Sequence, residues 1–397
     1  VKVWLRTRMD QGWKKTHLLS SALKGTVEAE KFILLAGHYD SWGPEGVLCN
    51  AVGISALVEW ARVLNQFRGQ LNRTIRFVFW GGHELGMGAA GPWYIDHYWE
   101  DVQDHLVLYS FLDSVGMKDP TVLESYCTPE LQPVYEDVIE DVGLPPYVKG
   151  VRFIIPSGAD IGTFSMYACV PTNRDVAARD YGPYVQRMDF MHSARDSLDL
   201  AAPNMFETAF RTLTTLYLRF CNLPILPLDY SVSGKQILNT LNTFRDHGNK
   251  IIDFTTPIHY AETFNQEYAR FYRMGEGVLE EYRKGKRDKK QERFQHQFRI
   301  INQVLIRLSR VINRILLSGF LKWDSYSVGL YTNVLDGLEP KSIPILEPIK
   351  ELTRLYPKGD QFGSLLTKLV RERNKVSDAL RLSTEIIQSA IKEVQKQ

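Results

Sequence analysis

The pattern of hydrophobic and polar residues divides the chain into two parts. Up to about residue 225, short apolar runs typical of strands alternate with amphipathic stretches typical of helices. Strands are expected at Thr16–Leu23, Lys31–Ala36, Arg73–Trp80, His105–Leu112 and Thr121–Ser125, and helices at Val52–Leu64, Leu85–His97, Glu130–Val142 and Pro203–Cys221. This alternation predicts an α/β fold with a doubly wound, mostly parallel sheet that carries helices on both faces.

The pattern changes after the segment Asn222–Pro227, whose two prolines end the alternation. Apolar residues then recur every three or four positions, as in a buried helical stripe. They are Phe294, Phe298, Ile301, Leu305, Leu308, Ile312 and Ile315. The stretch from Phe362 to Val394 is long and amphipathic, which suits a packed terminal helix or a subunit interface. We therefore predict an α/β domain over residues 1–227 and an all-α helical bundle over residues 228–397.

Composition and charge exclude several classes of protein. The 397 residues are 44% hydrophobic and 24% charged, as in an ordinary globular protein long enough for two cores. The net charge of +2 provides no general attraction to nucleic acid, and the basic run 284–290 is expected to be a solvated turn. No stretch approaches the roughly 18 consecutive apolar residues of a spanning helix. We expect neither a nucleic-acid partner nor a membrane segment, and the cellular compartment stays open.

Imidazole and carboxylate side chains follow three of the predicted strands and recur in a later loop. In chain order they are His38, Asp40, His83, Glu84, Asp113 and His192. Ligands of parallel α/β sheets bind where the strands end, so these side chains are expected to meet there. Among them, His38, Glu84, Asp113 and His192 form a set of nitrogen and oxygen ligands, and two imidazoles with carboxylates suit zinc or another borderline divalent ion. Taken alone, His38 followed by Asp40 fits a histidine that caps a turn as well as a ligand with its orienting carboxylate.

Other site chemistries lack their signatures. The sequence contains no GxSxG elbow, no GxxxxGK[ST] phosphate loop and no GxGxxG after its first strands. The four cysteines are too scattered for a disulfide scaffold or a CxxC zinc ribbon. Metal-assisted hydrolysis is therefore the remaining enzyme hypothesis, with zinc as the only expected cofactor.

A series of short motifs resembles, in order, the co-catalytic zinc peptidase family. They are GHYDSW at 37–42, NAVG at 50–53, FWGGHELG at 79–86, LDS at 112–114, CTP at 127–129, SGAD at 157–160 and HS at 192–193. The chain is most similar to the branch that contains glutamate carboxypeptidase and the transferrin receptor. The resemblance implies a zinc exopeptidase-like fold that begins after the position of that branch's apical domain. It also implies a homodimer formed through the helical domain.

The resemblance further implies two zinc ions that share one carboxylate. In that pattern His38 and Asp113 would hold one ion, Glu84 and His192 would hold the other, and Asp40 would orient His38. These ions would polarise a peptide carbonyl and activate water.

Two positions depart from the family pattern. Cys49 stands where the bridging Asp is expected, in a loop that looks one residue longer, and His83 stands where the general-base Glu is expected. Loss of the bridging carboxylate removes a charge and both oxygens that hold two cations together, although a Cys49 thiolate could bind one zinc. His83 could accept a proton, coordinate a metal or only form hydrogen bonds.

Three hypotheses follow. The first is a metallopeptidase-family protein with a degenerate site, weak or inactive as a peptidase, that acts as a dimeric receptor-like scaffold for a peptide or protein ligand. The second is an active metal-dependent exopeptidase, an aminopeptidase or a carboxypeptidase, with an altered or single-metal site. The third is an α/β scaffold in which these polar residues only hydrogen-bond one another.

Overall fold

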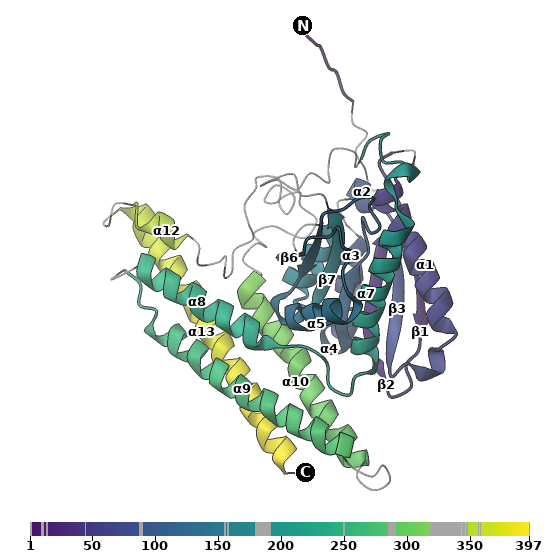
Figure 1. The fold of residues 1–397 in the computed structure, drawn as a ribbon. Helices are drawn as coiled ribbons and strands as arrows, with labels where there is room; N and C mark the ends of the chain where they lie inside the picture. The colour runs from purple at the N-terminus through teal and green to yellow at the C-terminus, as the bar shows by residue number, and fades with distance from the viewer. Residues whose placement is uncertain are drawn as a thin grey trace.

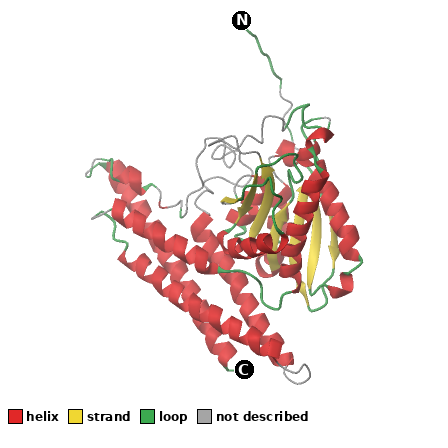
Figure 2. Ribbon diagram, viewed as in Figure 1, coloured by secondary structure: helices red, strands yellow, loops and turns green. Residues whose placement is uncertain are grey.

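The computed structural model shows an α/β part beside a bundle of long helices (Figures 1 and 2). It describes residues 2–8, 12, 15–43, 45–86, 90–154, 156, 159–178, 192–248, 251–284, 291–317, 343, 346, 348–355, 357 and 359–396. Residues 285–290 of the turn predicted over 284–290 lie outside this description, whereas Lys284 ends a helix. Residues 157 and 158 of the SGAD motif and the side chain of Asp160 also lie outside it.

The described strands form one seven-stranded sheet of order β1-β3-β2-β4-β7-β5-β6. Their bounds are β1 Leu19–Leu23, β2 Glu28–His38, β3 Arg73–Trp80, β4 Leu106–Phe111, β5 Val122–Cys127, β6 Val151–Ile154 and β7 Thr172–Ala178. β2 pairs in parallel with β3 and β4, β4 with β7, and β5 with β6. β1 is antiparallel to β3, and β7 to β5. The expected mostly parallel α/β sheet is confirmed.

Helices cover both faces of the sheet. The face that carries Ile33 and Phe77 packs against α1 Val52–Asn65, α5 Gln132–Val142 and α7 Pro203–Asn222. The opposite face packs against α3 Ala90–His97, α4 Trp99–His105, and α6 Ala159–Gly162 with η4 Thr163–Tyr167. Alternate residues of a strand point to opposite faces, so a nearly continuous apolar run such as that of β2 fills both layers.

One helical stretch, Val47–Asn65, is long and apolar enough by composition to cross a membrane. The same composition is typical of a core helix. Leu57, Trp60 and Leu64 of this stretch are buried in the layer against the sheet. Its packing accounts for its hydropathy.

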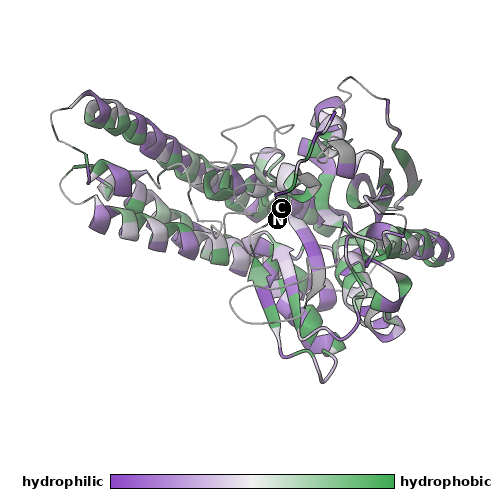
Figure 3. Cartoon of the chain, turned by 90° about the horizontal axis from the view of Figure 1, so that it is seen from above, coloured by the Kyte–Doolittle hydropathy of each residue, from purple (hydrophilic) through white to green (hydrophobic). Residues whose placement is uncertain are grey.

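The helical part contains α8 Tyr230–His247, α9 Thr255–Lys284, α10 Gln291–Leu317, α12 Ile349–Leu352 and α13 Asp360–Gln395. α13 packs against α9 and α10, and α8 packs against α9. The predicted apolar stripe lies on α10 and all of its members are buried. In Figure 3 the long helices carry both hydrophobic and hydrophilic residues, as expected for helices with one buried side. The domain boundary at residue 228 stays a prediction.

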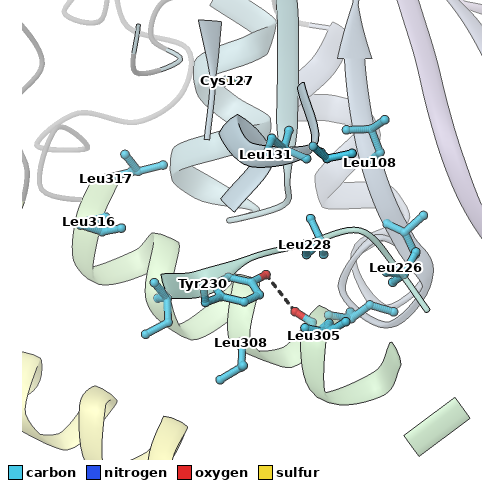
Figure 4. Packing of buried hydrophobic residues seen from close by; sticks show 14 of the residues in the cluster. Leu108, Cys127, Leu131, Leu226, Leu228, Tyr230, Leu305, Leu308, Leu316 and Leu317 are labelled. Carbon is cyan, nitrogen blue, oxygen red and sulfur yellow. Dashed lines mark hydrogen bonds between the residues drawn. The ribbon is translucent and has the colours of Figure 1, made fainter. Parts of the chain in front are cut away.

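The buried core continues from the sheet into the helices through the segment before α8. Figure 4 shows Leu226 and Leu228 between Leu305 of α10 and Leu108 of β4. The hydroxyl of Tyr230 donates to the carbonyl of Leu305 at 2.9 Å. α10 is thus attached directly to the α/β part.

β6 and β7 were not expected from the sequence. β6 has only four residues, and β7 carries the polar residues Asn173, Arg174 and Asp175. Both Asn173 and Asp175 are buried among polar partners from other elements. A buried strand with polar side chains lacks the apolar pattern by which strands are predicted.

The carboxylate of Asp175, on strand β7, is buried. Ser125 Oγ and Asn173 Nδ2 each donate to Asp175 Oδ1 at 2.9 Å, and the Tyr135 hydroxyl donates to Oδ2. Burial raises the pKa of Asp175 to about 6, because these hydrogen bonds only partly offset the loss of solvation.

Substituting Asp175→Asn is expected to flatten the pH dependence of stability. The folded-state pKa is raised above the usual value of about 3.9, so the stabilising contribution is complete below about pH 4 and is lost as pH rises through about 6. The wild type should lose about 3 kcal/mol of its free energy of unfolding over this pH range. At pH 8 the Asp175→Asn variant should be about 1–3 kcal/mol more stable than the wild type. Urea unfolding at several pH values measures both effects. The exposed Asp246→Asn is the control, and equal slopes for wild type and Asp175→Asn would contradict the prediction.

Candidate metal centre

The predicted site residues converge where the central strands end. His38 is the last residue of β2, His83 and Glu84 begin the short helix α2 His83–Gly86 after β3, and Asp113 follows β4. Cys49 comes from η1 Val47–Ala51, which leads into α1. All five side chains are buried, with exposed fractions of 0–7%.

The Cys49 thiol is the common neighbour of the potential ligands. It donates to Glu84 Oε1 at 3.0 Å and lies 3.7 Å from His38 Nε2 and 3.5 Å from His192 Nε2. His192 Nε2 in turn lies 3.1 Å from Glu84 Oε1. Burial raises the pKa of the Cys49 thiol, and the charges of Asp113 and Glu84 raise it further. Without a metal ion the sulfur therefore keeps its proton.

The donor atoms fit a single zinc ion. Among the described residues, the ligand atoms of His38, Cys49 and Glu84 all lie within 4.8 Å of one another. Tetrahedral zinc, with bonds of about 2.1 Å to nitrogen or oxygen and about 2.3 Å to sulfur, separates its ligand atoms by roughly 3.4–3.6 Å. The four measured separations of 3.0–3.7 Å bracket that range. His192 reaches the same cluster from the mouth of the site.

Glu84 and His192 are hydrogen-bonding partners, and each stabilises the charged form of the other. Burial acts to raise the pKa of Glu84, but hydrogen bonds from His192 and Cys49 outweigh it and the pKa is lowered. The hydrogen bond to Glu84 raises the pKa of His192. The His192 side chain is 31% exposed and its ring lies 6.2 Å from that of Trp42, so it lines the entrance.

Asp40 contacts the ring of His38 and also the backbone of His83 and Glu84. Its backbone carbonyl lies 2.8 Å from His38 Nδ1, whereas its carboxylate lies 3.9 Å away. The carboxylate oxygens accept hydrogen bonds from the backbone N–H groups of His83 at 3.1 Å and Glu84 at 2.9 Å. A carbonyl can only accept, so His38 Nδ1 is the donor and Nε2 faces Cys49 with its lone pair available to a metal. The orienting role of the Asp40 carboxylate stays a prediction.

The imidazole ring of His83 stacks on other rings of the site. Its ring lies parallel to that of His38, with centroids 4.1 Å apart and an interplanar angle of 13°. It also lies 5.6 Å from the ring of Phe111. This packing fixes the plane of His83, and its role as a general base stays a prediction.

Comparison with known proteins assigns the α/β part of the chain. Residues 20–215 match the family described as "Peptidase family M28". This part of the chain belongs to the co-catalytic zinc peptidases of family M28. The resemblance inferred from the motifs is thereby confirmed at the level of the family.

Two curated relatives are exopeptidases by description. A maize (Zea mays) protein described as "Probable glutamate carboxypeptidase VP8" is 23% identical over 268 residues, which cover 61% of this chain and 36% of the relative. The rat (Rattus norvegicus) aminopeptidase NAALADL1 is 23% identical over 286 residues, 64% of this chain and 38% of the relative. The chain therefore spans little more than a third of the length of these relatives.

Solved structures include similar zinc aminopeptidases. The structure of the zinc aminopeptidase BSAP from Bacillus subtilis is 21% identical, with a TM-score of 0.43. The superposition covers 50% of this chain and 48% of the other.

Two polar residues of the M28 site were missed by sequence reasoning. Asp196 accepts hydrogen bonds from the backbone N–H groups of Leu48 at 2.7 Å and Cys49 at 3.1 Å, which holds the loop of the thiol in place. In the sequence, the only indication that Asp196 belongs to the site was its position shortly after His192. Arg174 of β7 forms an ion pair with Asp113 and gave no signal, because its strand was not predicted.

The ion pair sets the charge of Asp113. Burial acts to raise the pKa of Asp113, but the Arg174 guanidinium and the His38 ring outweigh it, so the pKa lies below its usual range. Asp113 Oδ1 lies 3.7 Å from His38 Nε2, while Oδ2 faces Arg174. Asp113 thus lies between the candidate metal ligand His38 and the Arg174 guanidinium.

Proposed function

We propose that this M28 domain is a degenerate zinc peptidase that hydrolyses peptides weakly or not at all and acts as a binding scaffold. The observation that carries the proposal is the Cys49 thiol at the position where the family pattern has a bridging carboxylate. One sulfur in contact with His38, Glu84 and His192 offers a single donor in place of two oxygens. That arrangement supports one metal ion rather than a co-catalytic pair.

The state of His83 supports the same proposal. A general base must reach the proton that it abstracts within about 2.6–3.2 Å or through one water. The His83 ring is held by stacking on His38 beside Phe111, and it stands where the family pattern has a carboxylate. Since catalytic groups act as a unit, either substitution alone would already remove most of the activity.

An active metal-dependent exopeptidase with an altered or single-metal site is the second candidate. His38, Glu84, Asp113 and His192 still meet at one edge of the sheet, which favours retained metal chemistry. A zinc ion held there would act as a Lewis acid toward a peptide carbonyl. The relatives described as an aminopeptidase and a carboxypeptidase support cleavage at a peptide terminus.

Turnover of short peptides distinguishes the two candidates. The purified protein would be incubated with aminoacyl anilides and with dipeptides that end in glutamate, with added zinc and with a chelator. The scaffold proposal expects chelator-sensitive release that is absent or only marginally above the rate in buffer. Sustained release that is abolished by Glu84→Ala would establish the exopeptidase instead.

We also propose that the helical part forms a homodimer. The branch of the family that the chain resembles supports this, together with the length of α9 and α13. Light scattering is expected to give a mass near twice the 45.6 kDa of one chain. A monomer that persists at high protein concentration would contradict the proposal.

A further inference from the structure

We propose that the centre binds one divalent metal ion through the Cys49 thiolate, and that the Arg174 guanidinium supplies the positive charge that a second ion would otherwise bring. The inference rests on the proposed function only in that the site binds metal. It does not depend on whether peptides are cleaved.

The first step is the central position of the sulfur. Cys49 Sγ lies within 3.7 Å of ligand atoms of both His38 and Glu84, and within 3.5 Å of His192. Its proton now points to Glu84 and would leave to solvent when the sulfur binds a metal ion. A thiolate with imidazole and carboxylate selects zinc, cobalt or cadmium over magnesium or calcium.

The second step is the fixed position of Arg174. β7 pairs in parallel with β4, which places Arg174 beside the end of β4 and next to Asp113. The guanidinium carbon lies 5.6 Å from the Phe111 ring and 5.8 Å from the Tyr126 ring, and the side chain is only 11% exposed. The cation is thus held between aromatic rings and directed at Asp113.

The third step is the repulsion between positive charges. The Arg174 guanidinium engages Asp113 Oδ2, so a second ion at Asp113 would have to share that carboxylate with a fixed cation. Repulsion between the two positive charges, in a buried site, opposes the binding of a second ion.

Two further carboxylates direct their oxygens to the backbone. Asp40 accepts from the N–H groups of His83 and Glu84, and Asp196 accepts from those of Leu48 and Cys49. These neutral donors hold both carboxylates in place without cancelling their charge. The positive charge of Arg174 therefore opposes a second ion only at Asp113, the carboxylate that it contacts.

Metal counting with zinc and cobalt salts tests the proposal. The full chain, stripped and reloaded, is expected to retain one equivalent of zinc in elemental analysis. The cobalt form should show thiolate-to-metal charge-transfer absorption, and Cys49→Ser should lose that band and bind zinc at least about 10-fold more weakly. Two equivalents or none in the wild type, or no thiolate band, would overturn the proposal.

Variants of Arg174 test this repulsion. Arg174→Gln is expected to take up a second equivalent of zinc, whereas Arg174→Lys, which keeps the charge, should stay at one. An unchanged count in a folded Arg174→Gln protein would refute the role of the guanidinium. If Arg174→Gln does not fold, His83→Glu, which adds a carboxylate, should bring the count to two, and a count of one would refute this role of charge. Peptide turnover with one equivalent of metal would reject the scaffold proposal and leave this inference intact.

Discussion

The double substitution Cys49→Asp/His83→Glu is expected to raise chelator-sensitive peptide hydrolysis by at least about 10²-fold over the wild type. An aspartate at position 49 would offer two oxygens where the sulfur offers one donor, and a glutamate at position 83 would supply a carboxylate base. The added negative charge also favours a second metal ion beside Arg174. The remaining ligands His38, Glu84 and His192 already surround position 49, so no new framework is needed. Initial rates with aminoacyl anilides and C-terminal dipeptides measure the gain.

The matched control for this experiment is Cys49→Asp/His83→Gln. It keeps the shape of the new side chain at position 83 but cannot accept the proton, so it should lack most of the gain. Adding Glu84→Ala to the active pair should abolish turnover, because that carboxylate is a proposed metal ligand. Equal rates for the two double variants would show that position 83 is not the base. A wild type that is already as fast as the double variant would reject the degenerate-site proposal.

Replacing Arg310 by Met is expected to lower the free energy of unfolding by about 3 kcal/mol. The Arg310 side chain on α10 is buried and donates to the backbone carbonyls of Val102 at 2.9 Å, Leu106 at 2.7 Å and Gln103 at 3.2 Å. Burial lowers the pKa of Arg310 to about 10, so the group still carries its charge at neutral pH. Methionine would leave these carbonyls at the end of α4 without their donors in a place that water does not reach.

Urea unfolding followed by tryptophan fluorescence measures this loss. Arg307→Met is the matched control, because Arg307 lies on the same helix and is exposed. Its effect should stay within about 0.5 kcal/mol. Equal midpoints for the two variants would show that Arg310 does not attach the helical part to the α/β part.

Helix α10 carries both residues that the sequence pattern predicts to be buried and buried residues that it does not predict. The apolar stripe of α10 was predictable because its spacing of three and four residues is a local property of the chain. The polar residues of the same helix were not, since Arg310 and Asn313 find their partners near residues 102–106 and at Glu130. A buried polar residue is stable only through such partners, which the sequence pattern does not reveal.

The strands show the same difference between apolar positions, which were predictable, and buried polar positions, which were not. β3 was predicted to the residue, β4 within one residue and β2 within three, because central parallel strands are buried on both faces and are therefore mostly apolar. β7 was missed, because Arg174 and Asp175 are satisfied by Asp113, Ser125 and Tyr135 from distant parts of the chain.

The sequence by itself determined the family, the α/β fold, the identity of the candidate ligands and the two departures at positions 49 and 83, because residue types and their order along the strands are local facts. Only the tertiary structure decided what those departures mean physically. It placed the Cys49 sulfur among His38, Glu84 and His192, stacked His83 on His38 and paired Asp113 with Arg174. Distances of a few ångströms between residues far apart in the chain are set by packing, and they control whether a donor set holds one ion or two.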